Sequence, residues 1–129
     1  CRPITDDTVY DCGSSSDAFL IKKVTLNPRV PKRGQKLTVT ITGTAQQEIS
    51  KGTNAHVTAK LGIFTVVDKD YDFCEYVEDD KLKCPIQKGD HVITKVVEVP
   101  SNIPGGNYLV DGLVTLPNKK QVSRIQLKL

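Results

Sequence analysis

Apolar and polar residues alternate with a period of two over most of the chain. Leu37, Val39 and Ile41 alternate with threonine at positions 38, 40 and 42. Such alternation is typical of a β-strand with one buried face. The same pattern predicts five further strands, whose inward faces would be formed by Phe19, Ile21, Val24 and Leu26; by Ala55, Val57, Ala59, Leu61 and Ile63; by Ile93, Val97 and Val99; by Tyr108, Val110, Gly112, Val114 and Leu116; and by Ile125, Leu127 and Leu129.

Turn-forming residues separate these segments. Glycine, proline and asparagine gather around positions 31–34, 51–54, 88–90, 104–107 and 117–118, where they favour reversals of the chain. No segment shows a persuasive helical stripe. Short strands joined by turns, in a chain of 129 residues, predict an all-β fold and a single domain over residues 1–129. We expect an immunoglobulin-like antiparallel β-sandwich.

The predicted inward faces are lined by small aliphatic residues. The whole chain has three Phe, four Tyr and no Trp, whereas a solidly filled sandwich usually contains more aromatic volume. Two interpretations stay open at this point. The small residues either leave the sheets apart around an apolar guest or let the sheets approach each other closely.

Charge and length exclude several classes of protein. The net charge is +3, and the 18 basic residues are scattered rather than gathered on one element, which disfavours nucleic acid as a partner. No apolar run approaches the roughly 18–20 residues that span a bilayer. The chain starts at Cys1, so we expect a processed mature form.

The four cysteines favour disulfides over zinc. Cys1, Cys12, Cys74 and Cys84 contain no C-x-x-C pair, and the chain has two histidines, so zinc-site spacing is absent. Disulfides would place the protein in an oxidising compartment. Cys74 and Cys84 flank an acidic turn and can bridge a hairpin-like loop, although four cysteines allow three pairings.

Catalytic motifs are absent from the sequence. It contains no G-x-S-x-G elbow, no H-E-x-x-H pair, no EF-hand spacing and no catalytic cysteine context. We therefore expect no enzymatic activity, no resident metal and no cofactor.

Several short motifs, taken in order, resemble the ML lipid-recognition family. They are Asp11-Cys12-Gly13-Ser14, Lys22-Lys23-Val24 with Asn27-Pro28, Arg33-Gly34-Gln35, Tyr71-Asp72-Phe73-Cys74-Glu75, Cys84-Pro85-Ile86-Gln87-Lys88-Gly89 and Ile103-Pro104-Gly105-Gly106-Asn107-Tyr108. The family includes fungal phosphatidylglycerol/phosphatidylinositol transfer proteins, Niemann–Pick C-type cholesterol carriers and group 2 mite allergens. The likeness covers about residues 11–125 and is greatest to the fungal branch.

The resemblance implies a sandwich of seven or eight strands with an apolar cavity between the sheets. Lipid tails would fill this cavity and the headgroup would stay near its mouth. Each buried CH₂ contributes about 0.8 kcal/mol, so two acyl chains supply ample driving force. The implied function is transport of a sterol or phospholipid, as bound cargo, by a monomer that is secreted or lies in the vacuolar or lysosomal lumen.

One departure from the family concerns the disulfides. The family cysteine that matches Cys12 pairs with a cysteine in the last strand, where this chain has no thiol. Cys1 is the available replacement. The resemblance therefore implies the pairs Cys1–Cys12 and Cys74–Cys84.

The candidate site residues fall into three groups. The predicted cavity lining is Val39, Ile41, Val57, Ala59, Leu61, Ile63, Ile93, Val97, Val99, Tyr108, Val110 and Val114, each of which could instead be ordinary core. Gate residues at the mouth, or anchors of its loop, would be Phe64, Tyr71 and Phe73. Contacts with a lipid phosphate or an anionic membrane would come from Lys22, Lys23, Lys32, Arg33 and Lys95, unless these are solvated surface.

A second hypothesis belongs to a different class. A β-sandwich of this kind could be a protein-interaction module, of the adhesion or immune-partner type, with a filled core and no lipid cargo. A lipid that co-purifies with the protein would distinguish the two.

Overall fold

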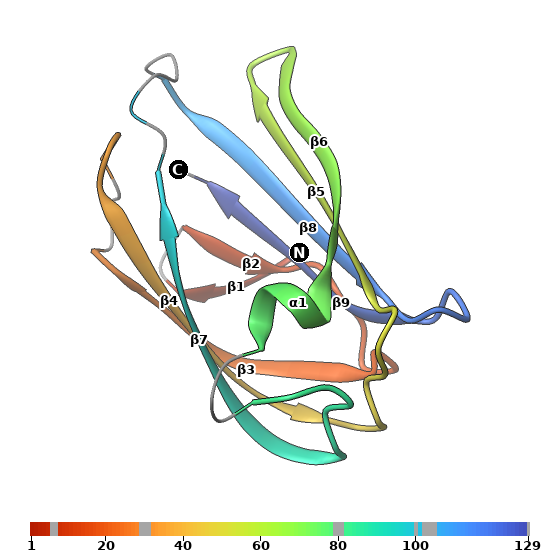
Figure 1. Ribbon diagram of the computed structural model, residues 1–129. Helices are drawn as coiled ribbons and strands as arrows, with labels where there is room; N and C mark the ends of the chain where they lie inside the picture. Colours follow the sequence, from red (N-terminus) through yellow and green to blue (C-terminus); the bar gives the residue numbers. More distant parts are fainter. Residues whose placement is uncertain (6–7, 29–31, 79–81, 100, 102–105, 129) are drawn as a thin grey trace.

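The computed structural model describes the chain except for residues 6–7, 29–31, 79–81, 100, 102–105 and 129. The described part forms two layers of antiparallel strands with one short helix at their side (Figure 1). The elements are β1 (Arg2–Thr5), β2 (Val9–Asp11), β3 (Phe19–Asn27), β4 (Lys36–Ala45), β5 (Asn54–Leu61), β6 (Phe64–Asp72), α1 (Phe73–Val77), β7 (Gly89–Glu98), β8 (Tyr108–Thr115) and β9 (Gln121–Lys128). The predicted all-β sandwich class is confirmed.

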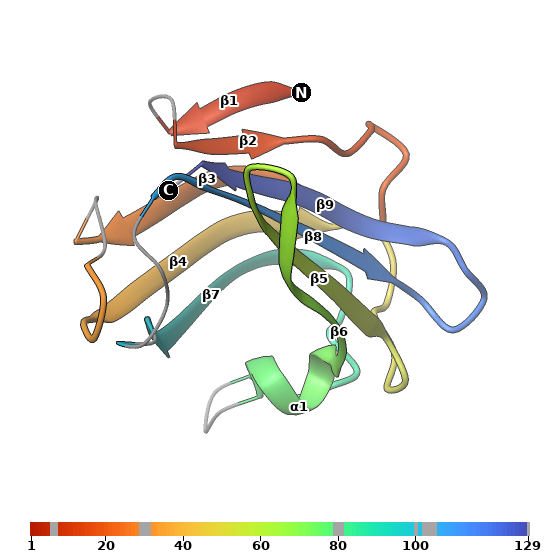
Figure 2. The same ribbon diagram turned by 90° about the horizontal axis from the view of Figure 1, so that it is seen from above.

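The two sheets differ in size. The larger has the strand order β1-β2-β9-β8-β5-β6, and the smaller has the order β3-β4-β7. Figure 2 shows the smaller sheet lying across one side of the larger one. Strand pairing keeps the apolar positions in step, because Ile41 of β4 lies between Val24 of β3 and Ile93 of β7. The period-two pattern therefore gives each sheet one apolar inward face.

The strand count and one strand boundary differ from the sequence prediction. The described residues form nine strands rather than seven or eight; β1, β2 and β6 are the strands that the alternating pattern did not predict. The prediction of one strand face that runs from Ala55 to Ile63 was also wrong. β5 ends at Leu61, and Gly62 turns the chain with a φ of 60°, a left-handed conformation that favours glycine. Ile63 therefore lies in the turn, 92% exposed.

The segment after β6, which the Cys74–Cys84 disulfide bridges, begins with a helical turn rather than a hairpin-like loop. Asp72 caps α1 by accepting a hydrogen bond of 3.3 Å from the backbone N–H of Glu75, as N-cap aspartates do. α1 has five residues, too few to produce a helical stripe in the sequence. Both disulfides implied by the resemblance are present, Cys1–Cys12 and Cys74–Cys84.

The most tightly buried residues form one cluster along β3 and around the Ile49–Ile86 bridge, which we call the packed region. Ile49 and Ile86 exchange two backbone hydrogen bonds of 2.9 Å and are each 1% exposed. Around them and along β3, the buried cluster comprises Val9, Ala18, Phe19, Ile21, Val24, Leu26, Leu37, Ala45, Cys74, Val77, Cys84, Ile93, Leu116 and Val122. The Cys74–Cys84 bridge belongs to this cluster.

The loop before β3 is organised by a buried carboxylate. Asp17 is 5% exposed and accepts hydrogen bonds from the Ser14 backbone N–H and from Gln121 Nε2. A Cβ on Gly13 would collide with the Asp17 carboxylate, so the Cys12-Gly13-Ser14 motif requires glycine at its centre. The motif thereby ties the start of β3 to β9.

Candidate functional site

The predicted lining residues lie on the inward faces of both sheets, apart from the turn residue Ile63. In the larger sheet, strand pairing places Val57 beside Gly112 and Ala59 beside Val110. In the smaller sheet, it places Leu37 beside Val97 and Val39 beside Lys95. Aliphatic side chains from the two sheets therefore oppose each other across the sandwich.

Many of these inward-facing side chains are not fully buried. Ala59 and Ile93 are each 8% exposed, whereas the other aliphatic positions retain intermediate contact with solvent. In a filled sandwich, aliphatic side chains on central strands are removed from solvent. We call these partly exposed inward positions the open region; its members are Val39, Ile41, Val57, Val97, Val99, Tyr108, Val110 and Val114. Five of them, Val39, Ile41, Val97, Val99 and Val114, also pack against the buried cluster, so the two regions adjoin on the same inward faces.

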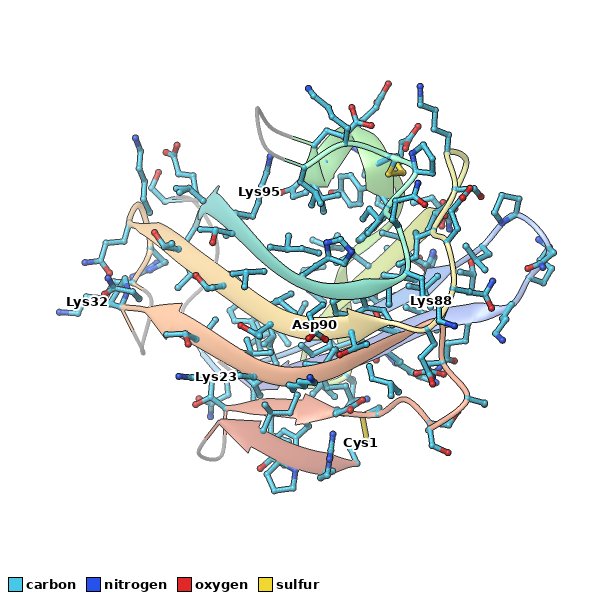
Figure 3. All side chains as sticks on the ribbon, turned by 90° about the horizontal axis from the view of Figure 1, so that it is seen from below. Cys1, Lys23, Lys32, Lys88, Asp90 and Lys95 are labelled. Carbon is cyan, nitrogen blue, oxygen red and sulfur yellow. A yellow bond between two sulfur atoms is a disulfide. The ribbon has the colours of Figure 1, made fainter. Side chains whose placement is uncertain are left out.

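Aromatic rings and lysines gather where the edge strands β6 and β7 lie on either side of α1. The rings of Tyr71 and Tyr76 meet edge-to-face, with 5.8 Å between centroids and 65° between planes. Lys69 Nζ lies 5.3 Å from the Tyr71 centroid, and Lys95 Nζ lies 5.0 Å from the Tyr76 centroid. In Figure 3, Lys95 lies beyond the edge of β7 beside α1. We call these four residues the edge cluster.

The other two predicted gate residues lie elsewhere. Phe73 is the first residue of α1, and its backbone N–H donates to the Thr53 carbonyl at 3.0 Å. Its side chain packs, partly buried, against the core, as expected of a residue that anchors a loop. Phe64 begins β6 at the hairpin turn and is 69% exposed.

Sequence reasoning missed Lys69 and Tyr76. β6 was not predicted; strand pairing places Val67, Lys69 and Tyr71 on the same face as the inward residues of β5. Predicting that strand would have placed Lys69 beside Tyr71. Tyr76 carried no such signal, because a five-residue helix has no recognisable period.

The predicted basic contacts separate into three locations. Lys22 pairs with Asp90 at 3.4 Å on the outer face of the smaller sheet, and Lys23 also lies on that face. Lys32 and Arg33 lie, exposed, in the turn before β4. Lys95 alone of the five faces inward. Figure 3 shows Lys23, Lys32 and Lys95 well separated.

The β5–β6 hairpin exposes an unusual number of apolar side chains. Ile63 and Phe64 form its tip, and Val66 and Val67 follow at 43% and 38% exposure. Figure 1 shows this hairpin at the same end of the sandwich as the start of β4, the end of β7 and the start of β8. The turn that carries Lys32 and Arg33 lies at that end too.

A groove of about 900 Å³ lies elsewhere, between the β1–β2 hairpin and β3. It is lined by Ile4, Leu20 and Ile21 together with polar groups of Asp11, Ser14 and Lys22. None of the predicted cavity-lining residues contributes to it, so this groove is separate from the open region.

The outer face of the larger sheet carries a histidine between two carboxylates. His56 Nδ1 lies 2.7 Å from Asp70 Oδ1, and His56 Nε2 lies 3.0 Å from Asp68 Oδ1. The hydrogen bond with Asp70 raises the pKa of His56 above its ordinary value. Hydrogen bonds from Asn54 and His56 lower the pKa of Asp70. The cluster faces away from the open region and is exposed to solvent.

Metal binding and membrane spanning find no support in the described residues. Across these residues, no group of three or more His, Cys, Asp or Glu side chains is placed to hold a metal ion. Within the same part of the chain, no helix is long and apolar enough to cross a bilayer.

Comparison with known proteins identifies the family. Residues 6–124 match the family model of the ML domain, and the chain belongs to this family. Proteins named phosphatidylglycerol/phosphatidylinositol transfer protein match from Kluyveromyces lactis, with 35% identity over 84% of this chain and 66% of that protein, and from Candida albicans, with 36% identity over 84% and 58%. One from Aspergillus fumigatus is 31% identical over 94% and 70%. The chain thus spans less than two thirds of the length of several relatives.

Solved structures support the fold. A Niemann–Pick type C2 protein from the Japanese carpenter ant superposes with a TM-score of 0.70 at 16% identity, covering 92% of this chain and 95% of that one. Chicken MD-1, solved as a complex with lipid IVa, gives a TM-score of 0.64 at 15% identity over 93% and 85%. The family assignment also supports the prediction that the chain is not an enzyme.

Proposed function

We propose that this chain binds a phospholipid or sterol between its two sheets and transfers it between membranes. The observation that carries the proposal is the open region. There, two aliphatic faces oppose each other, yet side chains such as Val57 and Val110 keep contact with solvent. Enclosing an apolar guest removes such surface from water, which lowers the free energy of the complex. The single domain would act as one lipid-binding unit.

The relatives guide the choice of cargo. The fungal relatives are named for phosphatidylglycerol and phosphatidylinositol transfer, which favours a glycerophospholipid. Burial of acyl chains at about 0.8 kcal/mol per CH₂ would hold the cargo without covalent chemistry. These names also favour lipid carriage over the protein-interaction module.

Transfer requires contact with a membrane, and one end of the molecule suits it. The apolar tip of Ile63 and Phe64 is exposed, and Lys32 and Arg33 lie at the same end. Apolar side chains can enter the interfacial zone of a bilayer, while basic side chains are attracted to anionic headgroups. We propose that a monomer docks with this end. The two disulfides support an oxidising compartment, the cell exterior or a vacuolar or lysosomal lumen.

Lipid extraction tests the cargo proposal directly. The purified chain is incubated with mixed vesicles of phosphatidylglycerol, phosphatidylinositol and ergosterol, isolated again, and examined by native mass spectrometry. We expect a mass increase that corresponds to one bound lipid. A chain that stays lipid-free under all these conditions contradicts the proposal.

Vesicle transfer tests the docking end. Each basic residue near an anionic surface contributes about 1 kcal/mol, and this decays within a Debye length of about 10 Å at 0.1 M salt. We expect transfer to be faster to anionic than to zwitterionic acceptor vesicles and to slow with added salt. Lys32→Glu with Arg33→Glu should slow it too.

The matched control reverses the same number of charges at the opposite end, with Lys51→Glu and Lys120→Glu. Both lysines are exposed and lie in neighbouring turns, where Gly52 approaches Pro117. Equal slowing by both pairs, or transfer that is indifferent to salt, contradicts the docking end.

A further inference from the structure

Two lysines lie on inward positions of the edge strands that flank α1. Lys95 of β7 stands between Ile93 and Val97, which share its face of the strand. Lys69 of β6 pairs with Val57 of β5 and so lies on the side of the larger sheet that carries the open region. Lys95 breaks the apolar alternation of β7, and Lys69 lies at the matching inward position of the largely exposed edge strand β6.

Aromatic contacts hold both ammonium groups at this edge. Lys69 lies over Tyr71 at 5.3 Å, and Lys95 lies over Tyr76 at 5.0 Å. The two rings meet edge-to-face at 5.8 Å, so the edge cluster runs from one sheet to the other. A ring face attracts a cation less strongly than a carboxylate or phosphate does, and it leaves the N–H donors free for an anion.

Neither lysine is neutralised by a carboxylate among the residues that the structure describes. Lys22, by contrast, pairs with Asp90 on the outer face. Lys95 is also half-buried beside its aliphatic neighbours, so its apolar stem can pack along the inward face while its ammonium group lies over Tyr76. The edge cluster thus presents two positive charges and two phenol groups beside the open region.

We propose that the edge cluster binds the phosphate of a glycerophospholipid whose acyl chains occupy the open region. This inference rests on the proposed function and adds the site of headgroup selection. The phosphate draws the ammonium groups of Lys69 and Lys95 from the tyrosine rings and forms charge-assisted hydrogen bonds with them. The same two lysines give a phospholipid an advantage over a neutral lipid with identical tails.

The experiment is a competition between two lipids that differ in the headgroup. The full chain is equilibrated with vesicles that contain equal amounts of dioleoyl phosphatidylglycerol and dioleoylglycerol, and the bound lipids are quantified by mass spectrometry. Wild type should prefer phosphatidylglycerol. Lys95→Gln and Lys69→Gln should each reduce the ratio of the two bound lipids by about tenfold, the value of one charge-assisted contact.

The matched control is Lys88→Gln, which removes an exposed lysine from the loop before β7, far from Lys95 (Figure 3). Its lipid ratio should equal that of wild type. Bound dioleoylglycerol reports that each variant is folded, and Lys95→Arg, which keeps the charge, should retain the preference. If Lys95→Gln yields no folded protein, the lipid ratio of Lys69→Gln, on the exposed edge strand, tests the proposal by itself.

The outcomes separate the two proposals. Wild type that takes up neither lipid overturns the proposed function. Uptake of both lipids, with a ratio that the lysine variants leave unchanged, overturns the headgroup site alone. Free glycerol 3-phosphate that binds wild type as tightly as phosphatidylglycerol would assign the cluster to a soluble phosphate and overturn the headgroup site as well.

Discussion

The packed region and the open region are built from the same aliphatic residue types on the same alternating strands, yet they differ in what covers them. Ile49 and Ile86 pair with each other and belong to the same buried cluster as the Cys74–Cys84 disulfide. Val57 and Val110 face the opposite sheet but remain in contact with solvent. An apolar pattern therefore determines which face a side chain occupies, and the residues that pack over that face in the folded chain determine whether the side chain is buried.

This difference suggests a division of labour. The packed region supplies the cohesion of the fold, and the open region is left free to accept a guest. Substitutions in the packed region should therefore affect stability, and substitutions in the open region should affect lipid binding.

Truncating the packed core should have the largest effect on stability. Ile86 is 1% exposed, so Ile86→Ala should lower the free energy of unfolding by about 2–5 kcal/mol through lost burial and a new cavity. Val110→Ala in the open region should cost about 1 kcal/mol, because its side chain is already partly exposed. Urea unfolding of lipid-free protein measures both. Equal losses would mean that the open region is packed after all.

The two disulfides form a second matched pair. Their sequence separations are 11 and 10 residues, so the chain-entropy model gives each about 2.8 kcal/mol. Cys74 and Cys84 are buried, however, and Cys1 is exposed. Replacing Cys74 and Cys84 by alanine should therefore destabilise more than replacing Cys1 and Cys12.

Thiol titration of the denatured, non-reduced wild type should detect no free thiol. Two or more reactive thiols would contradict the disulfide framework. Identical losses from the two alanine pairs would show that burial at the Cys74–Cys84 bridge adds nothing beyond loop closure.

Filling the open region should abolish lipid binding with little change in stability. Val57→Trp and Val110→Trp would each occupy the space proposed for the guest. If the region were already full, overpacking would instead cost about 1–3 kcal/mol. Lipid uptake and urea unfolding are measured on the same samples. Val92→Trp, on the outer face at a position that is 63% exposed, should change neither.

The smallest effect is expected on the outer face, where His56 joins Asp70. The pKa of His56 is raised above 6.5 and that of Asp70 is lowered below 3.8. The pair therefore stabilises the fold fully between these two values. Its contribution is lost as the pH rises through the folded-state pKa of His56, and also as the pH falls through that of Asp70.

His56→Gln should accordingly lower the thermal midpoint more at pH 5.5 than at pH 9. Asp70→Asn should produce the same dependence, and the double variant should add little to either single change. Lipid binding should not respond, because the cluster faces away from the open region. A pH-independent effect of His56→Gln would contradict the ion pair.

Much of the fold was predictable because it is encoded locally. Alternation over 37–42 and 55–61 determines which side chains point inward, and turn residues mark where most strands end. The β6 strand escaped prediction because both its faces are largely exposed. Its sequence therefore shows no contrast between a buried and a solvated side.

The candidate site was predictable only in part. Inward aliphatic residues follow from the period of two, but their half-buried state depends on what packs over them in the folded chain, which no local pattern encodes. Tyr76 and Lys69 belong to elements that the sequence did not predict. Lys95 was recognised as a possible phosphate contact, yet nothing in its neighbours indicated an aromatic partner.

By itself, the sequence determined an all-β sandwich with one apolar face per sheet, because period-two alternation and turn chemistry act over a few residues. Tertiary structure decided the strand order, the division between the packed and open regions, and the edge cluster. The edge cluster, for example, depends on a contact between separate elements, because Tyr76 of α1 meets Tyr71 of β6 and Lys95 of β7. Only the folded chain brings Lys69 and Lys95 to the two sides of the Tyr71–Tyr76 pair.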